Sequence, residues 1–191
     1  TSIGSKIFSY CESLSDVSIP ESVTSIGESA FSSCDDLESV NYGGTVAQWE
    51  AINIADGNFD LITAKIRCTD GVYVPHGTCG ENVTWKLDEN GTLIISGTGD
   101  MYDYTFNETA SWYDINSQIK SIVIESGVTG IGEWAFNGSN NLNTVEISDT
   151  VKIVPQNAFA TCWHLGAFVV DENSTCFSAV DGVLFNKDKT E

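Results

Sequence analysis

The stretch TSIGESAFSSCDDLESVNYGGTV, from Thr24 to Val46, decides the fold because it nearly repeats the stretch before it. The preceding stretch, TSIGSKIFSYCESLSDVSIPESV from Thr1 to Val23, begins with the same four letters. The two stretches also place Phe, Cys, Leu and Val at the same offsets. Self-similarity at a fixed period of 20 to 50 residues, roughly, is the signature of a repeat architecture.

Alignment at the period that separates Thr1 from Thr24 gives four full copies, which start at Thr1, Thr24, Thr129 and Lys152, and a half copy before the third. Five apolar columns run through the four copies, and chance does not produce such agreement. The columns are Ile3, Ile26, Ile131 and Val154; Phe8, Phe31, Phe136 and Phe159; Leu14, Leu37, Leu142 and Leu165; Val17, Val40, Val145 and Phe168; Ile19, Tyr42, Ile147 and Val170; the half copy supplies Ile119, Ile122, Ile124 and Val128.

A single copy cannot bury its apolar side chains alone, so the pattern predicts stacked coils with each column as an internal ladder. Neighbouring strands in such a stack lie about 4.8 Å apart. The stretch LESVNY (Leu37 to Tyr42) alternates apolar and polar residues and should be the strand of its coil. GESAFSSC (Gly27 to Cys34) should form a turn or a short helical segment on the opposite side.

These residues resemble the BspA-like leucine-rich repeats of bacterial surface proteins. TSIGESAFSSCDDLESV (24–40) and TGIGEWAFNGSNNLNTVEI (129–147) match that pattern closely. YGGTVAQWEAI (42–52) and GTCGENVTWKLDENGTLIISGTGDM (77–101) look like flanking segments, and VDGVLFNKDKT (180–190) looks like a repeat variant. The resemblance implies a β-rich α/β leucine-rich-repeat solenoid, whose 23-residue coils stack short strands in a parallel sheet, plus a β-hairpin cap. It also implies a role in attachment, since some relatives bind host matrix proteins or other cells.

An interruption between Val46 and Ile119 predicts three parts. Residues 1–70 should be the end of a first repeat block with its C-terminal cap, residues 71–118 a linker with a β-hairpin N-terminal cap, and residues 119–191 a second block. Within the first cap, strand-like alternation is expected at Ile62, Ala64, Ile66 and Cys68. One continuous solenoid with an insertion is the alternative.

The expected hairpin has apolar residues alternating on both sides of an Asn90-Gly91 turn. An exposed end of a solenoid needs a cover for its apolar ladder. The hairpin could supply this cover with two aromatic residues from the next segment. The residues concerned are Val83, Trp85, Leu87, Leu93, Ile95, Trp112 and Tyr113.

The charge of the chain limits the classes of partner that it could bind. The formal net charge is −19, from 27 acidic and 8 basic side chains. This argues against nucleic acid, whose phosphates are neutralised by Lys and Arg, and against anionic membrane surfaces. No apolar run approaches the roughly 20 residues of a membrane span. Because the sequence starts inside a repeat and stops inside an expected strand, we interpret it as a fragment of a longer protein.

The sequence offers little for catalysis. His76 and His164 are the two histidines, and neither lies in a recognisable motif. Cys162 is close to His164 in sequence, but it shares a structural column with Cys11 and Cys34, and a nucleophile does not recur in such a column. We therefore expect no enzyme activity, no catalytic residue and no cofactor.

The cysteines have two interpretations. Cys11 and Cys34 should stack on adjacent coils at a Cα separation of roughly 5 Å, within disulfide range, but parallel side chains in a ladder favour free thiols. Cys68 and Cys79 flank a loop and are the better candidates for a disulfide. A zinc site of Cys68, His76 and Cys79 lacks a fourth ligand and paired spacing.

Two further surface features have a simple interpretation. The acidic clusters at Asp35 and Asp88 do not follow a calcium-loop pattern, so solvated surface is expected and no metal site is predicted. N-x-[ST] triplets would be glycosylated only in a eukaryotic secretory route. They begin at Asn82, Asn90, Asn107, Asn137 and Asn173.

The remaining candidate site is the outward face of the strands, which a solenoid tiles into one extended recognition surface. We expect a non-catalytic module for adhesion or protein–protein interaction, extracellular on a bacterial surface or secreted. Its partner would be a protein or a glycan on host or neighbouring cells, and the chain itself would be monomeric, without membrane insertion. The alternative is a structural spacer: a binding face should expose apolar or aromatic residues, and a spacer should be uniformly polar. The candidate residues are Asp16, Ser18, Glu38, Asn41, Lys120, Val123, Asn143, Glu146, Ala167 and Val169.

Overall fold

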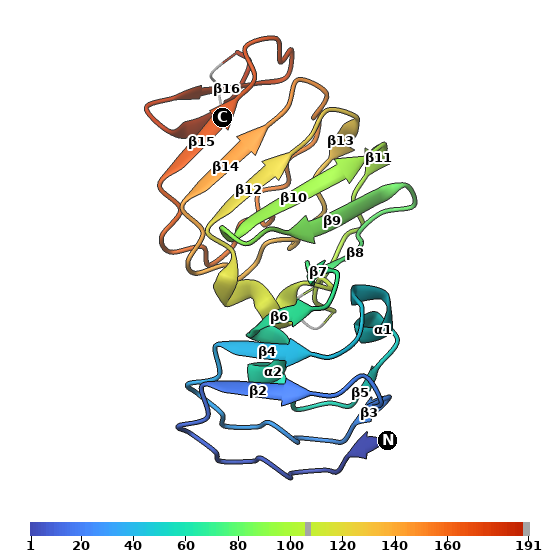
Figure 1. Ribbon diagram of the computed structural model, residues 1–191. Helices are drawn as coiled ribbons and strands as arrows, with labels where there is room; N and C mark the ends of the chain where they lie inside the picture. Colours follow the sequence, from blue (N-terminus) through green and yellow to red (C-terminus); the bar gives the residue numbers. More distant parts are fainter. Residues whose placement is uncertain (106–107, 189–191) are drawn as a thin grey trace. The chain divides into compact units, whose positions relative to one another are not determined.

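The computed structural model describes residues 1–105 and 108–188, and the chain divides into two compact units, Thr1–Tyr73 and Val74–Glu191 (Figure 1). Both units consist mainly of short strands joined by turns, with few helical residues. Among the described residues no helix is long and apolar enough to cross a bilayer.

The first unit contains two ladders of short parallel strands, and apolar side chains from both ladders form its core. One ladder has the order β1-β3-β5 and the other the order β2-β4-β6-β7, with only β7 antiparallel to its neighbour. The elements are β1 (Ser2–Ile3), β2 (Asp16–Ile19), β3 (Ser25–Ile26), β4 (Ser39–Tyr42), α1 (Val46–Glu50), β5 (Asn53–Ile54), α2 (Phe59–Thr63), β6 (Lys65–Cys68) and β7 (Gly71–Val72).

The repeat period of the sequence is the register of the strands. Asp16 pairs with Ser39, which is one repeat period further along the chain. Ser39 in turn pairs with Lys65, so the second step along the chain is longer than the first. Helices α1 and α2 occupy the longer step and are the main departure from the repeat pattern.

Local chemistry explains helix α1. The Thr45 hydroxyl accepts the N–H of Gln48, and the Gln48 side chain accepts the N–H of Thr45 at 2.8 Å, which makes a capping box. Trp49 then packs edge-on against Tyr42, with ring centroids 5.4 Å apart. The strand-like alternation expected from Ile62 is wrong at its start, because helix α2 extends to Thr63 and the strand begins at Lys65.

Asn58 connects two successive turns of the first unit. Its side chain is buried, with 3% of its surface exposed. Its Oδ1 accepts the N–H of Phe31 at 3.0 Å, and its Nδ2 donates to the carbonyls of Gly27 at 3.0 Å and Ala55 at 2.7 Å. One amide side chain therefore satisfies three backbone groups, which buried polar groups require.

The second unit is built on a six-stranded sheet with the order β15-β14-β12-β10-β9-β8 (Figure 1). Strands β10, β12, β14 and β15 are parallel to one another, and β8, β9 and β10 form an antiparallel meander. The elements are β8 (His76–Thr78), β9 (Val83–Leu87), β10 (Thr92–Gly97), β11 (Gly99–Asp100), the 3-10 helix η1 (Tyr113–Gln118), β12 (Ser121–Ile124), β13 (Val128–Gly130), β14 (Thr144–Ile147), β15 (Ala167–Val170), β16 (Phe177–Val180) and β17 (Val183–Asn186).

The apolar columns of the third repeat (129–151) form the centre of this unit. Ser121 pairs with Thr144, and Thr144 with Ala167, so each pairing joins positions one repeat period apart. The column residues of the half copy and the third repeat are between 0 and 3% exposed, as the periodicity predicts. These are Ile119, Ile122, Ile124, Val128, Ile131, Phe136, Leu142, Val145 and Ile147.

The hairpin predicted from sequence is present as β9 and β10, with Leu87 opposite Leu93. Its turn is held by Asp88, whose Oδ1 accepts the N–H groups of Asn90 at 2.9 Å and Thr92 at 2.8 Å. Burial raises the pKa of this carboxyl, but the hydrogen bonds outweigh burial and leave the pKa below its usual value. Strand β10 then pairs in parallel with β12, which joins the hairpin to the repeats.

The turns of the repeats share a backbone requirement. The tenth residue of each copy lies in the left-handed region, with φ of 62° at Tyr10, 56° at Ser33, 76° at Gly138 and 56° at Thr161. This conformation is easy only for glycine. Successive turns are joined by backbone hydrogen bonds, such as the one from Phe8 N to the carbonyl of Ala30 at 2.8 Å.

A second hairpin, β16 and β17, follows the fourth repeat (152–174). Asp181 and Gly182 form its two-residue turn, with φ of 51° and 81°, as a tight hairpin turn demands. The carbonyl of Gly182 accepts the N–H of Phe168 on β15 at 2.8 Å. The VDGVLFNKDKT segment therefore supplies the turn and the second strand of a hairpin that contacts the last repeat strand; its final two residues lie outside the described residues.

Candidate interaction surface on the outward sheet faces

The outward face of the first unit is polar throughout. Asp16, Ser39 and Lys65 occupy one register row across β2, β4 and β6. Ser18, Asn41 and Arg67 occupy the next outward row, and all three are exposed. Each row alternates with the buried apolar rungs, so the polar side chains point away from the core.

Three of the ten candidate residues lie one position before the strands. Glu38, Lys120 and Asn143 precede β4, β12 and β14, and the strands begin at Ser39, Ser121 and Thr144. The prediction that these three are strand residues is therefore wrong by one position. The other seven, Asp16, Ser18, Asn41, Val123, Glu146, Ala167 and Val169, lie on strands.

The outward face of the second unit differs because apolar residues lie along its centre. We call Lys86, Ile94, Val123, Glu146 and Val169 the central row, since each pairs with the next across β9, β10, β12, β14 and β15. Val169 is 52% exposed, and Ile94 and Val123 are partly exposed. Neighbouring strands lie about 4.8 Å apart, so the row has the Lys86 side chain at one end and Glu146 next to Val169 at the other end.

A second outward row of this face carries hydroxyl groups. Thr92, Ser121, Thr144 and Ala167 pair across β10, β12, β14 and β15. The Ser121 hydroxyl donates to the Thr92 hydroxyl at 3.1 Å, and the Thr144 hydroxyl to Oδ1 of Asn143 at 3.1 Å. The face therefore offers apolar side chains next to hydroxyls, both positioned by strand register.

Sequence reasoning missed Ile94 and Lys86 because the repeat alignment does not reach the β9–β10 hairpin. A usable signal was present, since Leu93 and Ile95, which flank Ile94, were predicted as alternating apolar positions of the hairpin. Alternation on a strand then places Ile94 on the opposite face.

The cysteine and histidine of the fourth repeat are directed at different groups. The Cys162 thiol donates to the carbonyl of Phe136 at 3.1 Å, while His164 Nδ1 faces the carbonyl of Asn140. Burial raises the pKa of the Cys162 thiol to about 11, so it is protonated at neutral pH and a poor nucleophile. His76, the other histidine, is exposed, and its Nδ1 lies 2.9 Å from the carbonyl of Val74.

All six cysteines lie in the described part of the chain as free thiols, and Cys68 and Cys79, the better candidates for a disulfide, belong to different units. Cys79 belongs to the apolar core of the second unit, and burial raises its pKa to about 12. Cys34 is also buried, and its thiol donates to the carbonyl of Phe8 at 3.2 Å. These two thiols act as small packing groups.

No group of three metal-ligating side chains is found within residues 1–105 and 108–188. Of the N-x-[ST] asparagines, Asn82, Asn90 and Asn173 are exposed, and Asn107 lies outside the described residues. Asn137 is partly buried, and its Oδ1 accepts the hydroxyl of Thr161 at 2.9 Å.

The fold and the repeat register define a leucine-rich-repeat protein with many short parallel strands. The family model described as the BspA type leucine rich repeat region matches residues 1–59 and 101–181 in six copies. The chain belongs to this family.

Three solved structures are similar to parts of the chain. A leucine-rich repeat protein from Eubacterium ventriosum is 21% identical with a TM-score of 0.35, covering 61% of this chain and 50% of that one. The T. pallidum leucine rich repeat protein is 18% identical with a TM-score of 0.30, covering 88% and 51%. A leucine rich cell surface protein from Faecalibacterium prausnitzii is 19% identical with a TM-score of 0.31, covering 88% and 62%. The chain thus spans half to three fifths of the lengths of these proteins, and the comparison with curated proteins gave no match.

Proposed function

We propose that this chain is a non-catalytic, extracellular module for adhesion or protein–protein interaction, placed on a bacterial surface or secreted. Its contact surface is the outward sheet face of the second unit. The repeats act as a solenoid scaffold, with the β9–β10 hairpin as the N-terminal cap of the second block. Membership in the BspA-type family supports this assignment.

The observation that carries the proposal is the exposure of apolar residues on that face. Strand register holds Ile94, Val123 and Val169 on the outward face. The inward positions of the same strands also carry apolar residues, so these strands are apolar on both faces. Ile94 and Val123 lie on the inner strands β10 and β12 with polar groups around them, which is typical of an interface core and rim, and Val169 adds an exposed apolar side chain on the end strand β15. Lys86 and Glu146 add opposite charges along the same row.

The partner that fits this surface is a protein that presents apolar side chains between a basic group facing Glu146 and an acidic group facing Lys86. A net charge of −19 disfavours nucleic acid, whose binding depends on clustered cations. Like-charge repulsion also favours a monomer in solution. A glycan is the less favoured partner, because the central row carries no aromatic ring for a sugar to stack on.

The test is an array of host matrix proteins and of bacterial and plant glycans, probed with the whole chain. We expect saturable binding to a protein at micromolar concentration. Absence of any binding at that concentration would contradict the proposal and favour the second candidate function.

That second candidate is a structural spacer that presents other domains. The specific observation in its favour is the polar outward face of the first unit, where Ser18, Asn41 and Arg67 are exposed and no apolar residue accompanies them. The first unit has the surface of a spacer, so the binding role is assigned to the second unit alone.

A further inference from the structure

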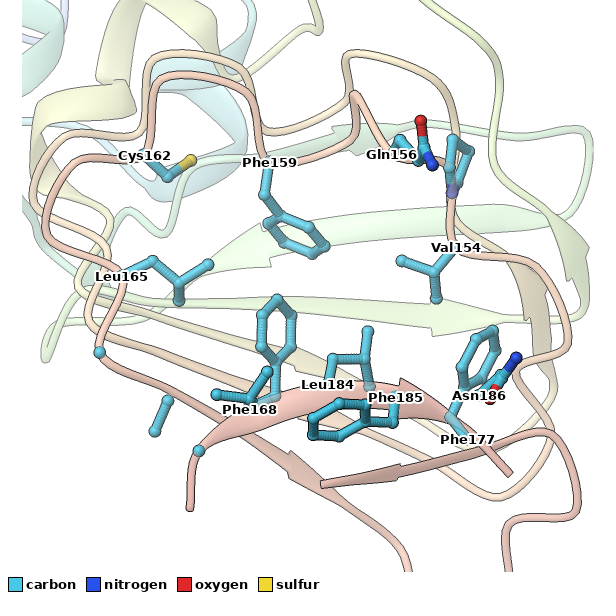
Figure 2. A pocket seen from close by; sticks show the side chains of 15 residues that line it. Val154, Gln156, Phe159, Cys162, Leu165, Phe168, Phe177, Leu184, Phe185 and Asn186 are labelled. Atoms are coloured by element: carbon cyan, nitrogen blue, oxygen red, sulfur yellow. The ribbon is translucent and has the colours of Figure 1, made fainter. Parts of the chain in front are cut away.

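A pocket of about 650 Å³ lies between the fourth repeat and the β16–β17 hairpin. Figure 2 shows side chains from both segments facing the same hollow. Phe159, Leu165 and Phe168 come from the repeat, and Phe177, Leu184 and Phe185 come from the hairpin. Its volume lies within the range of roughly 300–1,000 Å³ that is typical of ligand pockets.

The repeat side of the pocket is lined by column residues of the fourth repeat that are less buried than the equivalent residues of the third repeat. In the third repeat, Phe136, Leu142 and Val145 are fully buried, because the fourth repeat packs over them. Their counterparts in the fourth repeat, Phe159, Leu165 and Phe168, are only partly buried. Within the described residues, the hairpin covers the fourth repeat incompletely, and the space left between them is the pocket.

A stack of aromatic rings ends at this pocket. Trp112 stacks on Phe136 with centroids 5.5 Å apart and planes at 22°, and Phe136 stacks on Phe159 at 5.2 Å and 19°. Phe168 meets Phe159 edge-on at 82° and does not continue the stack. Phe159, the last ring of the stack, lines the pocket.

The lining carries no charged side chain, although the chain as a whole carries 27 acidic residues. The Cys162 thiol in the wall is hydrogen-bonded to a carbonyl and stays neutral at physiological pH. An uncharged apolar group gains from entering such a site, whereas a charged group would lose hydration without gaining a partner.

We propose that this pocket binds an aromatic side chain, Trp or Phe, of a partner polypeptide, with its ring stacked on Phe159. A polypeptide fits because the other partner of Phe159 is itself a side chain, Phe136, delivered by a neighbouring repeat with Leu142 and Val145 beside it. The pocket continues that repeat–repeat interface. The site is separate from the outward face, with which it shares only Ala167 among the candidate residues.

The experiment uses the whole chain with methyl-labelled Leu and Val, titrated with N-acetyl-tryptophanamide and N-acetyl-leucinamide. We expect saturable ring-current shifts at the methyls of Val154, Leu165 and Leu184, with the tryptophan amide bound at least fivefold more tightly than the leucine amide. Phe159→Leu should reduce that preference to less than twofold. Phe177→Leu removes a ring from the opposite wall and serves as the matched control, so it should keep the preference.

Several results would overturn the proposal. Absence of shifts in the wild type or equal affinity for the two amides would do so, and so would an unchanged preference in a folded Phe159→Leu chain. If that variant fails to fold, the wild-type preference and the Phe177→Leu result still decide. Free indole binding ten times more tightly than the tryptophan amide would assign the pocket to a small molecule. Shifts of the same methyls with protein concentration alone would assign it to a second copy.

Discussion

Replacement of Asn58 tests whether one buried amide holds two turns of the first unit together. In Asn58→Ala the amide of Phe31 and the carbonyl of Ala55 lose their partner, whereas the carbonyl of Gly27 still accepts the N–H of Ala30 at 3.3 Å. A buried group left without a partner costs about 1–3 kcal/mol, so two such groups predict a loss of about 4 kcal/mol in the free energy of unfolding.

Asn58→Asp gives a more specific signature. The carboxylate can still accept from Phe31, but its second oxygen faces the carbonyls of Gly27 and Ala55. Protonation lets that oxygen donate to one of them, so the pKa of this carboxyl should be raised in the folded chain. The variant should then regain stability as the pH falls from 7 to 4, because the folded chain takes up the proton first.

The assay is urea denaturation of the whole chain, with amide hydrogen exchange at Phe31 to report on the first unit. Asn41→Ala is the control, because Asn41 is exposed on β4 and should change stability by less than about 0.5 kcal/mol. A loss in Asn58→Ala no larger than that of the control would refute the reasoning.

Three further predictions concern ionisation and backbone strain. The raised pKa values of Cys79 and Cys162, about 12 and 11, mean that these thiols ionise at a lower pH in the unfolded chain than in the folded chain, so the free energy of unfolding should fall from pH 9 upward. Denaturation at pH 7 and pH 10.5 should show a smaller fall in the variant that carries alanine at both positions. Equal falls in the variant and the wild type would be contrary evidence. Gly138→Ala should cost about 1 kcal/mol from its φ of 76° alone, because the nearest atom to the added Cβ is 3.7 Å away, and Thr161→Gly at the equivalent position should cost less; thermal unfolding in the reverse order would refute this. The lowered pKa of Asp88 contributes stability that is lost as the pH falls through the pKa of the folded chain. Asp88→Ala should therefore be less stable than the wild type at pH 7, and its stability should fall less steeply as the pH is lowered. An unaltered dependence of stability on acid pH would contradict this prediction.

The apolar columns were predictable because burial of a repeat imposes strict residue types at fixed intervals. Phe31, Val40 and Phe136 lie in the core as the period requires, and the strands of successive copies pair one period apart. The β9–β10 hairpin was also predictable, because Asn90-Gly91 is a strong turn signal between alternating segments. The columns depend on residue types that each copy carries in full, and the hairpin depends on a local turn signal.

Features that break the period were harder to predict. Polar residues precede β2, β4, β12 and β14, so periodicity alone could not distinguish Glu38 from Ser39 as the first residue of β4. The capping box of Thr45 and Gln48 was visible in the sequence, but the interpretation of residues 42–52 as a flanking segment did not include helix α1. The Cys79 side chain packs in the apolar core of the second unit, and this burial could not be predicted from the spacing of the cysteines along the chain.

The candidate surface was predictable in kind but not in composition. Strand alternation identified Val123, Glu146 and Val169, yet Ile94 and Lys86 joined them only through the pairing of β9 and β10 with β12. The pocket beside Phe159 could not be predicted, because it is a volume left between side chains and has no sequence pattern of its own.

The most direct test of the central claim is the dissociation constant of the bound protein ligand for two matched double variants. Val123→Asp with Val169→Asp changes the central row of the second unit, and Ser18→Asp with Asn41→Asp places the same charges on the outward face of the first. The account predicts at least a tenfold weakening for the first pair and less than a twofold change for the second. Equal dissociation constants for the two folded variants would contradict it.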